Sequence, residues 1–135
     1  MKVSSARFGV STSKRNQMLD ISGQVQQALA RVGAREGVVH VYVPHTTAGI
    51  TVNENADPDV AHDVLAKLAS LVPHEDDYKH AEGNADAHIK TILTGTSVTM
   101  HIAGGELQLG EWQGIFLCEF DGPRQREVWL KIIGD

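Results

Sequence analysis

Cysteine is almost absent from this sequence: Cys118 is the only one, so the chain cannot form an internal disulfide framework. No apolar run is long enough to span a membrane, and residues 1–19 lack the apolar core of a signal peptide. No stripe of lysine and arginine is present, and carboxylates outnumber these bases by 17 to 12. We therefore expect a cytoplasmic protein that binds neither nucleic acid nor a membrane.

Three common catalytic signatures are also missing. The sequence has no Gly-x-Ser-x-Gly elbow, no phosphate-binding P-loop and no dinucleotide-binding glycine fingerprint. Their absence argues against a serine hydrolase, a nucleotide triphosphatase and a Rossmann dehydrogenase. What the chain does have is enough apolar material for one core, since 35 of its 135 residues are leucine, isoleucine, valine or phenylalanine. We expect a single domain over residues 1–135.

Three helices are predicted from apolar residues at helical spacing. The first begins at a Ser22 cap and ends at Gly33, which suits a left-handed cap. The second begins at Asp57, whose carboxylate can accept from first-turn N–H groups, and the third begins within 83–86 and ends at Gly95. The residues expected to face the interior are Val25, Ala28, Leu29 and Val32 in the first helix, Val60, Val64, Leu65, Leu68 and Leu71 in the second, and Ile89, Ile92 and Leu93 in the third.

Strands are predicted before, between and after these helices. Residues 37–43 are mostly β-branched, and we expect this strand to be buried on both faces. From residue 97 onward only strands are predicted, and turns at 104–105 and 121–123 favour an antiparallel meander. Helices and strands that do not strictly alternate indicate an α+β fold. The predicted strands cover 7–10, 18–21, 37–43, 50–52, 97–102, 107–109, 114–120 and 127–133.

Carboxylates and histidines concentrate in residues 54–88, which hold nine of the 17 carboxylates and four of the seven histidines. Only Lys67 and Lys79 oppose them. Imidazole and carboxylate together can complete the shell of a divalent metal. A solvated acidic surface is the simpler interpretation for many of these side chains. We assign that simpler role to Asp59, His62, Asp63, Glu75, Asp76 and Asp77.

Two polar clusters are less easily explained as solvated surface. The first is His-Thr-Thr-Ala-Gly at 45–49, directly after a predicted strand and followed by the polar run 53–57. Loops at strand ends commonly carry function. The second cluster, 80–88, places His88 in the first turn of a predicted helix, where the helix end also favours anions. The spacing of His80 and His88 matches no standard zinc signature, so metal binding and a structural role both remain open.

A third cluster, Gly-Glu-Trp-Gln-Gly at 110–114, is either a binding turn or a tight hairpin with Trp112 over the core edge. Arg124 follows the next turn, where it could grip a phosphate or lie as an ordinary surface charge. Cys118 lies in a run that is apolar on both strand faces, and we expect an inert core thiol. Glu119 needs a partner if it is buried, and an arginine is the expected one.

These motifs together make the chain resemble the YjbQ-like family. The first runs over 45–59, His-Thr-Thr-Ala-Gly-Ile-Thr-Val-Asn-Glu-Asn-Ala-Asp-Pro-Asp. The second is Glu-Gly-Asn-Ala-Asp-Ala-His at 82–88. The third, Leu-Gly-Glu-Trp-Gln-Gly-Ile at 109–115, continues into Cys-Glu-Phe-Asp-Gly-Pro-Arg at 118–124. The resemblance covers essentially the whole chain, with one departure: Glu111 stands where the family usually has Thr, and an extra carboxylate there would favour a cation over phosphate.

The resemblance implies an α+β fold with a β-sandwich-like core and about three helices, assembled as a homotrimer. It also implies a pocket in which His45, His80 and His88 bind a divalent metal, zinc or magnesium, or an oxyanion such as sulfate or phosphate. The other positions that match the family's motifs, as candidates for ligand binding, are Asn53, Glu54, Asp57, Glu82, Asn84, Trp112, Gln113 and Arg124.

Proteins that this chain resembles have been credited with a weak thiamine phosphate synthase activity. That reaction joins a hydroxymethylpyrimidine pyrophosphate to a thiazole phosphate and releases pyrophosphate. Arg124 and a divalent metal could neutralise the leaving group, while His45 or His88 could transfer a proton. Two alternatives remain: a metal-dependent hydrolase of a small phosphorylated metabolite, and a module that binds a metal or metabolite without turning it over.

Assembly is suggested by the late strands as well. Residues 97–133 carry apolar side chains on both predicted faces, more than a chain of this length easily covers alone. Closed cyclic symmetry is the usual way to cover such faces. We therefore expect the chain to have itself as a partner, in addition to a small phosphorylated metabolite.

Overall fold

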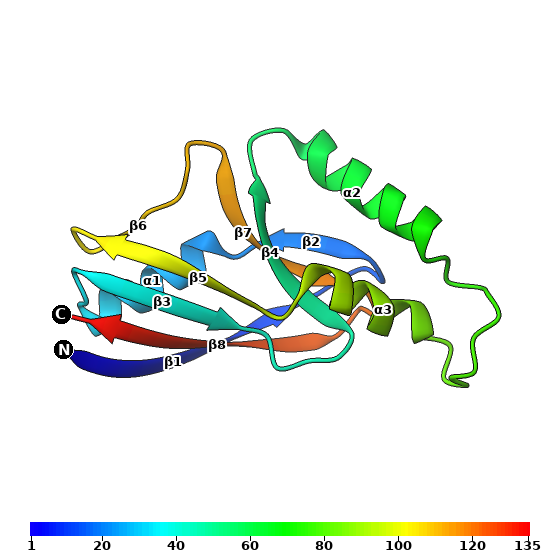
Figure 1. The fold of residues 1–135 in the computed structure, drawn as a ribbon, viewed down its shortest axis with the longest axis horizontal. Helices are drawn as coiled ribbons and strands as arrows, with labels where there is room; N and C mark the ends of the chain where they lie inside the picture. The colour runs from blue at the N-terminus through cyan, green and yellow to red at the C-terminus, as the bar shows by residue number, and fades with distance from the viewer.

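A computed structural model describes the chain from residue 1 to residue 135. The fold is α+β, as predicted, with three helices and eight strands (Figure 1). The strands are β1 (Lys2–Ser11), β2 (Gln17–Asp20), β3 (Gly37–Tyr42), β4 (Ala48–Glu54), β5 (Ser97–Ala103), β6 (Glu106–Leu107), β7 (Gln113–Glu119) and β8 (Gln125–Gly134). The helices are α1 (Ser22–Val32), α2 (Pro58–Leu71) and α3 (Ala85–Thr94).

The strands form two antiparallel sheets, a larger one in the order β1-β8-β3-β5-β6 and a smaller one in the order β2-β7-β4. The predicted meander after residue 97 is therefore wrong, because β7 joins the smaller sheet and β8 pairs with β1 and β3. Only β5 and β6 form a consecutive hairpin, through Gly104 and Gly105 at φ angles of 59° and 80°. The composition of a turn indicates that the chain reverses direction there. It does not indicate which sheet the next strand joins.

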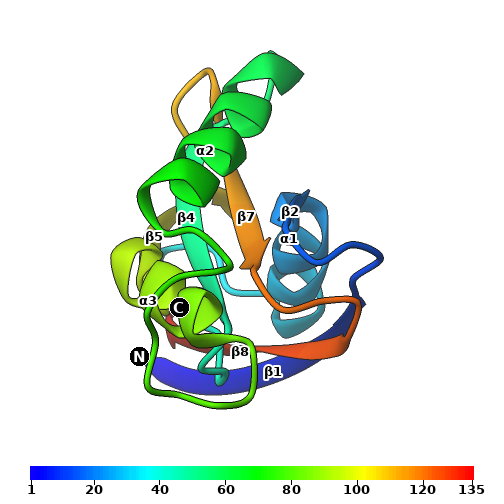
Figure 2. The same ribbon diagram turned by 90° about the vertical axis from the view of Figure 1, so that its right-hand side faces the viewer.

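The two sheets face each other across the main core, which also takes in α1. A smaller apolar cluster of Ala87, Phe116, Cys118 and Phe120 lies on the other side of the smaller sheet, under α2 and α3. The central strand β7 is consequently buried on both of its faces. No helix covers the outer face of β1 and β8, as the two ribbon views show (Figures 1 and 2).

Cys118 is the inert core thiol that the sequence predicts. The side chain is 2% exposed, and burial raises the pKa of the thiol to about 12. Because the thiolate is the reactive form, this thiol is unreactive in the folded chain.

Strand β3 differs from its prediction. Val39 and Val41 are fully buried against the core, whereas His40 and Tyr42 point to the outer face of the larger sheet and are exposed. The strand is therefore buried on one face only. An antiparallel sheet can expose one of its faces to solvent. The β-branched composition of the strand does not show whether one face or both are buried.

The helix ends follow the sequence at Asp57, Gly33 and Gly95, the last of which ends α3 as predicted, but not at Ser22. Asp57 caps α2 as predicted, accepting from the backbone N–H of Asp59 at 2.9 Å, and Gly33 ends α1 with a φ of 77°. Ser22 does not cap α1. Its hydroxyl instead accepts from the backbone N–H of Ile115 at 2.8 Å, and so ties the start of the helix to β7.

Helix α3 turns a different face inward from the one predicted. Ile89, Ile92 and Leu93 were expected inside but are 38%, 79% and 59% exposed. Asp86 and Lys90 are buried in their place, because they form an ion pair of 3.1 Å one turn apart and so neutralise each other. The buried residues of α3 are Ala85, Asp86, Ala87, Lys90 and Thr91.

Helix α2 packs loosely on the fold. Leu65 and Leu68 touch the smaller apolar cluster, but none of its 14 residues is buried. Leu71, the last residue of the predicted apolar stripe, is 64% exposed. None of the three helices is long and apolar enough to cross a membrane.

The burial pattern predicts unequal effects for two matched substitutions in the larger sheet. Val39→Ala removes two methyl groups from a fully buried site and should lower the free energy of unfolding by about 2 kcal/mol or more. Val3→Ala, at a position that is 66% exposed, should cost less than about 1 kcal/mol. Urea unfolding followed by circular dichroism at one protein concentration measures both. Equal losses would contradict the assigned core.

Candidate functional site

The candidate residues lie at opposite ends of the strand pair β4–β7. Ala48 faces Glu119 at one end of this pair, and Glu54 faces Gln113 at the other. Seven residues of β4 at about 3.3 Å each separate the two ends by about 20 Å. We call the first the histidine end, comprising His45, Thr47, His74, His80, Glu82, Asn84, His88, Asp121 and Arg124, and the second the carboxylate end, comprising Asp20, Asn53, Glu54, Asn55, Asp57, Glu111, Trp112 and Gln113.

A buried ion pair underlies the histidine end. Arg126 on β8 donates from Nε to Glu119 Oε1 at 2.8 Å and from Nη2 to Oε2. Thr12 donates its hydroxyl to the same carboxylate at 2.8 Å, and Arg126 Nη2 donates to the hydroxyl of Thr47 at 2.8 Å. The predicted arginine partner of Glu119 is thus confirmed. Burial by itself would raise the pKa of Glu119, but the hydrogen bonds from Arg126, the backbone of Asp121 and Thr12 outweigh it and lower the pKa.

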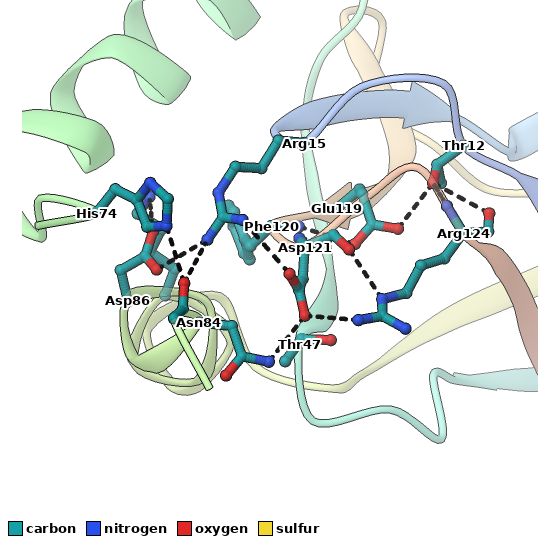
Figure 3. A network of polar contacts seen from close by, with 12 residues as sticks. Thr12, Arg15, Thr47, His74, Asn84, Asp86, Glu119, Phe120, Asp121 and Arg124 are labelled. Carbon is teal, nitrogen blue, oxygen red and sulfur yellow. Dashed lines mark hydrogen bonds and ion pairs between the residues drawn. The ribbon is translucent and has the colours of Figure 1, made fainter. Parts of the chain in front are cut away.

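Charges of alternating sign run from the interior of α3 to the surface of this end (Figure 3). Lys90 and Arg15 both contact Asp86, each at 3.1 Å. Arg15 also pairs with Asp121 at 3.5 Å, and Asp121 pairs with Arg124 at 3.0 Å. Asp86 and Lys90 are buried, while the side chain of Arg124 is 53% exposed. This series of five linked side chains contains three cations and two carboxylates. It therefore has one excess positive charge, and it ends at Arg124.

Arg124 is held in place by one residue through two contacts. Its Nε donates to the backbone carbonyl of Asp121 at 2.8 Å, and its Nη2 donates to the carboxylate at 3.0 Å. Asn84 donates to the same carboxylate at 2.9 Å. Burial would raise the pKa of Asp121, but the bonds from Asn84 and Arg124 lower it. The second terminal nitrogen of Arg124 has no partner in the chain and remains free to bind an anion.

His45 is fixed by the backbone of β8. Its Nε2 accepts from the N–H of Glu127 at 2.9 Å, so the proton of the neutral ring lies on Nδ1. Partial burial, together with the positive charge of Arg126, lowers the pKa of His45. The ring is therefore neutral at pH 7 and presents Nδ1–H as a donor.

His80 and His88 are the two histidines that the structure brings together. Their ring centroids lie 5.2 Å apart at right angles, and His80 Nε2 lies 3.7 Å from the carboxylate of Glu82. No three histidine, cysteine, aspartate or glutamate side chains of one chain are arranged to hold a metal ion. The donors of a single chain therefore do not fit the predicted three-histidine metal shell.

At the carboxylate end, most polar candidates serve the local backbone. Asn53 accepts from the N–H of Glu54 at 2.7 Å, and Glu54 accepts from the N–H of Asp57 at 3.2 Å. Gln113 accepts from the N–H of Gly110 at 2.8 Å. Trp112, however, is 57% exposed, so it does not cover the core edge. Glu111 beside it is exposed and makes no hydrogen bond or ion pair within the chain.

Sequence reasoning missed part of the histidine end. Arg15 lies 71 residues from Asp86, and no local pattern announces their contact. The pair Asp86 and Lys90 did carry a signal, because opposite charges four residues apart on a helix can pair. The solvated acidic surface was predicted correctly: Asp59, His62, Asp63, Glu75, Asp76 and Asp77 are all exposed.

Comparison with known proteins gives one consistent family. The family described as UPF0047 protein YjbQ-like matches residues 6–135. The UPF0047 protein MJ1081 of Methanocaldococcus jannaschii is 50% identical over 129 residues, which cover 96% of this chain and 94% of that protein.

Solved structures agree with the fold. A YjbQ/UPF0047 family protein from Clostridium acetobutylicum, 50% identical, superposes with a TM-score of 0.93 over 95% of this chain and 99% of that one. A YbjQ-like protein of unknown function from Sulfolobus solfataricus, 33% identical, gives a TM-score of 0.94 over 99% of both chains. The resemblance inferred from the three motifs is confirmed.

The buried pair at the histidine end predicts a large and pH-dependent loss in Glu119→Gln. At pH 7 this change leaves the Arg126 charge unpaired and should lower the free energy of unfolding by about 3–5 kcal/mol. Because the pKa of Glu119 is lowered, its carboxylate stabilises the fold above its ordinary value of 4.5, and this contribution is lost as pH falls through the lowered pKa. The difference in the free energy of unfolding between the unmodified protein and Glu119→Gln should therefore become smaller in acid.

Chemical denaturation at pH 7 and at steps below pH 4.5 provides the measurement. Glu127→Gln, which changes an exposed carboxylate on the same strand as Arg126, is the matched control and should stay within about 0.5 kcal/mol. A gap for Glu119→Gln that stays constant into acid would show that its charge does not stabilise the fold.

Proposed function

The chain belongs to the YjbQ-like UPF0047 family, and from its histidine end we propose a transferase of the thiamine phosphate synthase type that binds a phosphorylated metabolite through Arg124. One observation carries the proposal. Arg124 is fixed by Asp121 through two bonds, yet half of its side chain and one terminal nitrogen remain open to solvent. A guanidinium ordered before binding loses less entropy when it grips a phosphate.

The charged side chains linked to Arg124 favour the binding of an anion beside its guanidinium. The line from Lys90 through Asp86, Arg15 and Asp121 to Arg124 has one positive charge in excess. The buried pair of Asp86 and Lys90 anchors Arg15, which in turn contacts Asp121, the residue that orients Arg124. Low dielectric at their end strengthens the interactions that fix it.

The chemistry of the proposed reaction needs charge neutralisation more than proton transfer. The bond between the pyrimidine methylene carbon and the pyrophosphate oxygen breaks, and the thiazole nitrogen supplies the electron pair for the new carbon–nitrogen bond. Pyrophosphate leaves with the electrons of the broken bond. Arg124 opposes the charge that develops there, and the Nδ1–H of neutral His45 is a donor for a phosphate oxygen. His88 is the second candidate for proton transfer.

A second candidate function is binding without turnover. It is favoured by the carboxylates of Asp86 and Asp121, which neutralise Lys90 and Arg15 and leave one arginine for the leaving group. Enzymes that release pyrophosphate usually oppose its charge with several cations. A protein of this second kind holds the phosphorylated ligand and forms no product.

We also propose that the chain assembles as a homotrimer. The apolar surplus lies elsewhere than the sequence suggested: β7 is covered on both faces within the chain, whereas Leu71, Ile92 and Leu93 on α2 and α3 are 64%, 79% and 59% exposed. Burial of such a side chain stabilises a complex by up to about 1.5–3 kcal/mol. A cyclic assembly supplies the missing cover.

Substitution of Arg124 tests the transferase. Arg124→Ala removes a charge-assisted contact worth about 2–4 kcal/mol, so pyrophosphate release with both precursors should fall about 30- to 1000-fold. Arg124→Lys should retain part of the rate, because it keeps the charge but loses the fork. Arg31→Ala, at an exposed site on α1, is the matched control.

The same proteins separate the two candidate functions. Pyrophosphate release that equals the rate without enzyme, together with calorimetric binding of pyrophosphate that Arg124→Ala abolishes, would establish the binding module. Release that Arg124→Ala does not change would refute the role of Arg124.

The assembly is tested by mass. Light scattering at micromolar concentration should give three times the mass of one chain. Ile92→Asp introduces a charge into the exposed apolar face and should shift the population toward the monomer, whereas Val3→Asp, on the outer face of the larger sheet, should not. A monomeric unmodified protein would refute the trimer.

A further inference from the structure

A cleft lies between the helices α2 and α3 and the face of the smaller sheet that they cover (Figure 2). Its volume is about 200 Å³, and seven of its ten lining residues are apolar. Cys118 and Phe120 are buried at its floor, whereas Leu93 is 59% exposed and lies at its mouth. No residue of the histidine end lines this cleft, so it is a separate feature of the molecule.

The cleft exists because the two helices approach the sheet to different depths. Gly49 of β4 has no side chain, and a Cβ there would overlap Thr94 Oγ1, so the end of α3 packs directly on the strand. Helix α2 has no buried residue, and its Val64, Leu65 and Leu68 line the cleft without filling it. An apolar cavity that stays empty destabilises a fold in proportion to its volume. This space therefore favours an occupant.

The size and the charge of the lining define what can bind in the cleft. None of the ten lining residues is aspartate, glutamate, lysine, arginine or histidine, so the cleft favours a neutral ligand. An apolar protein cavity of about 150 Å³ binds benzene, and a cleft of about 200 Å³ therefore has room for about eight non-hydrogen atoms. Water finds few partners in such a lining, and an apolar ring displaces it favourably.

One edge of the cleft offers hydrogen-bonding groups. Thr51 and Asn53 are two residues apart on β4, so their side chains lie on the same face of the smaller sheet. The hydroxyl of Thr51 has no hydrogen-bond partner within the chain. Asn53 accepts from the N–H of Glu54 through its Oδ1 at 2.7 Å, and its Nδ2 is left as a donor. A ligand that combines an apolar ring with one polar group suits both the floor and this edge.

We propose that this cleft is a binding site for a neutral small molecule with an apolar ring and a single hydrogen-bonding group. The ring lies between Cys118, Phe120 and the apolar side chains of α2, and the polar group bonds to Thr51 or Asn53. The site is independent of the proposed phosphate contact at Arg124, because Arg124 does not line the cleft. Helix α2 can admit the ligand at little cost, since its outward movement exposes no fully buried residue of its own.

Phenol is a suitable probe, because it is a neutral ring that carries one hydroxyl. The three methionines report where it binds: Met18 lines the cleft, Met100 lies in the main core, and Met1 is 93% exposed. In NMR spectra of protein with isotope-labelled methionine methyl groups, phenol should shift the Met18 signal saturably, with a Kd of about 1 mM or below. The signals of Met1 and Met100 should not move.

Three variants test the assignment to this cleft. Val64→Phe fills the cleft from α2 and should weaken phenol binding about tenfold or more. Leu71→Phe, at the exposed end of the same helix, is the matched control and should leave the Kd unchanged. Thr51→Val keeps the shape of the side chain but removes its hydroxyl. It should weaken phenol binding about fivefold and leave the binding of toluene, which has no hydroxyl, unchanged.

Leu93 at the mouth of the cleft also belongs to the apolar face that the proposed trimer covers, so the titration is repeated with Ile92→Asp. Saturable Met18 shifts in both proteins support the site. Shifts in Ile92→Asp alone would show that a neighbouring chain fills the cleft in the assembled protein, and would overturn the small-molecule ligand. The absence of a Met18 shift from both proteins, or equal shifts at Met18 and Met100, would overturn it as well.

The variants give the remaining outcomes. An unchanged Kd in Val64→Phe places phenol outside the cleft and overturns the site. A phenol Kd that Thr51→Val leaves unchanged, or an equal loss of phenol and toluene binding, overturns the contact with the Thr51 hydroxyl. None of these measurements depends on transferase activity, so the failure of the proposed reaction leaves this test intact.

Discussion

The ion pair of Glu119 and Arg126 joins the two sheets, and the candidate site depends on it. Glu119 ends β7 in the smaller sheet, and Arg126 lies on β8 in the larger one. Thr12 and Thr47 attach the chain after β1 and before β4 to the same pair. Glu119 also accepts from the backbone N–H groups of residues 120 and 121, so it sets the turn that carries Arg124. Apolar residues of equal volume could stabilise this position as well, but they could not orient that turn.

Polar order therefore extends outward from the core of this protein. The pair fixes the turn, Asp121 in the turn fixes Arg124, and Arg15 connects Asp121 to the buried Asp86 of α3. Each carboxylate has two or more partners, which is the condition under which buried charge is tolerated. One consequence appears on α3, where the burial of the charged face leaves Ile92 and its neighbours exposed to solvent.

The sequence predicts those features that depend on neighbouring residues. The Asp57 cap, the Gly33 helix end and the inert Cys118 all follow from a few adjacent side chains. The inward face of α3 and the assignment of β7 and β8 to different sheets could not be predicted, because both depend on partners far along the chain. Arg15 is the clearest case, since its contact with Asp86 adds to the Asp86–Lys90 pair in stabilising a charged helix face inside the fold.

Helix α2 gives the fold an uneven dynamic profile. Without a buried residue it lacks the packing that supports most helices, and 14 residues are barely enough for a helix to persist by itself in water. Its amide hydrogens should accordingly exchange with solvent through local opening, at a free energy well below that of global unfolding. Cys118 lies under this helix, and Leu65 and Leu68 of α2 pack against the apolar cluster that contains its thiol. The single thiol of the chain is thus a natural reporter on how often this layer of the molecule opens.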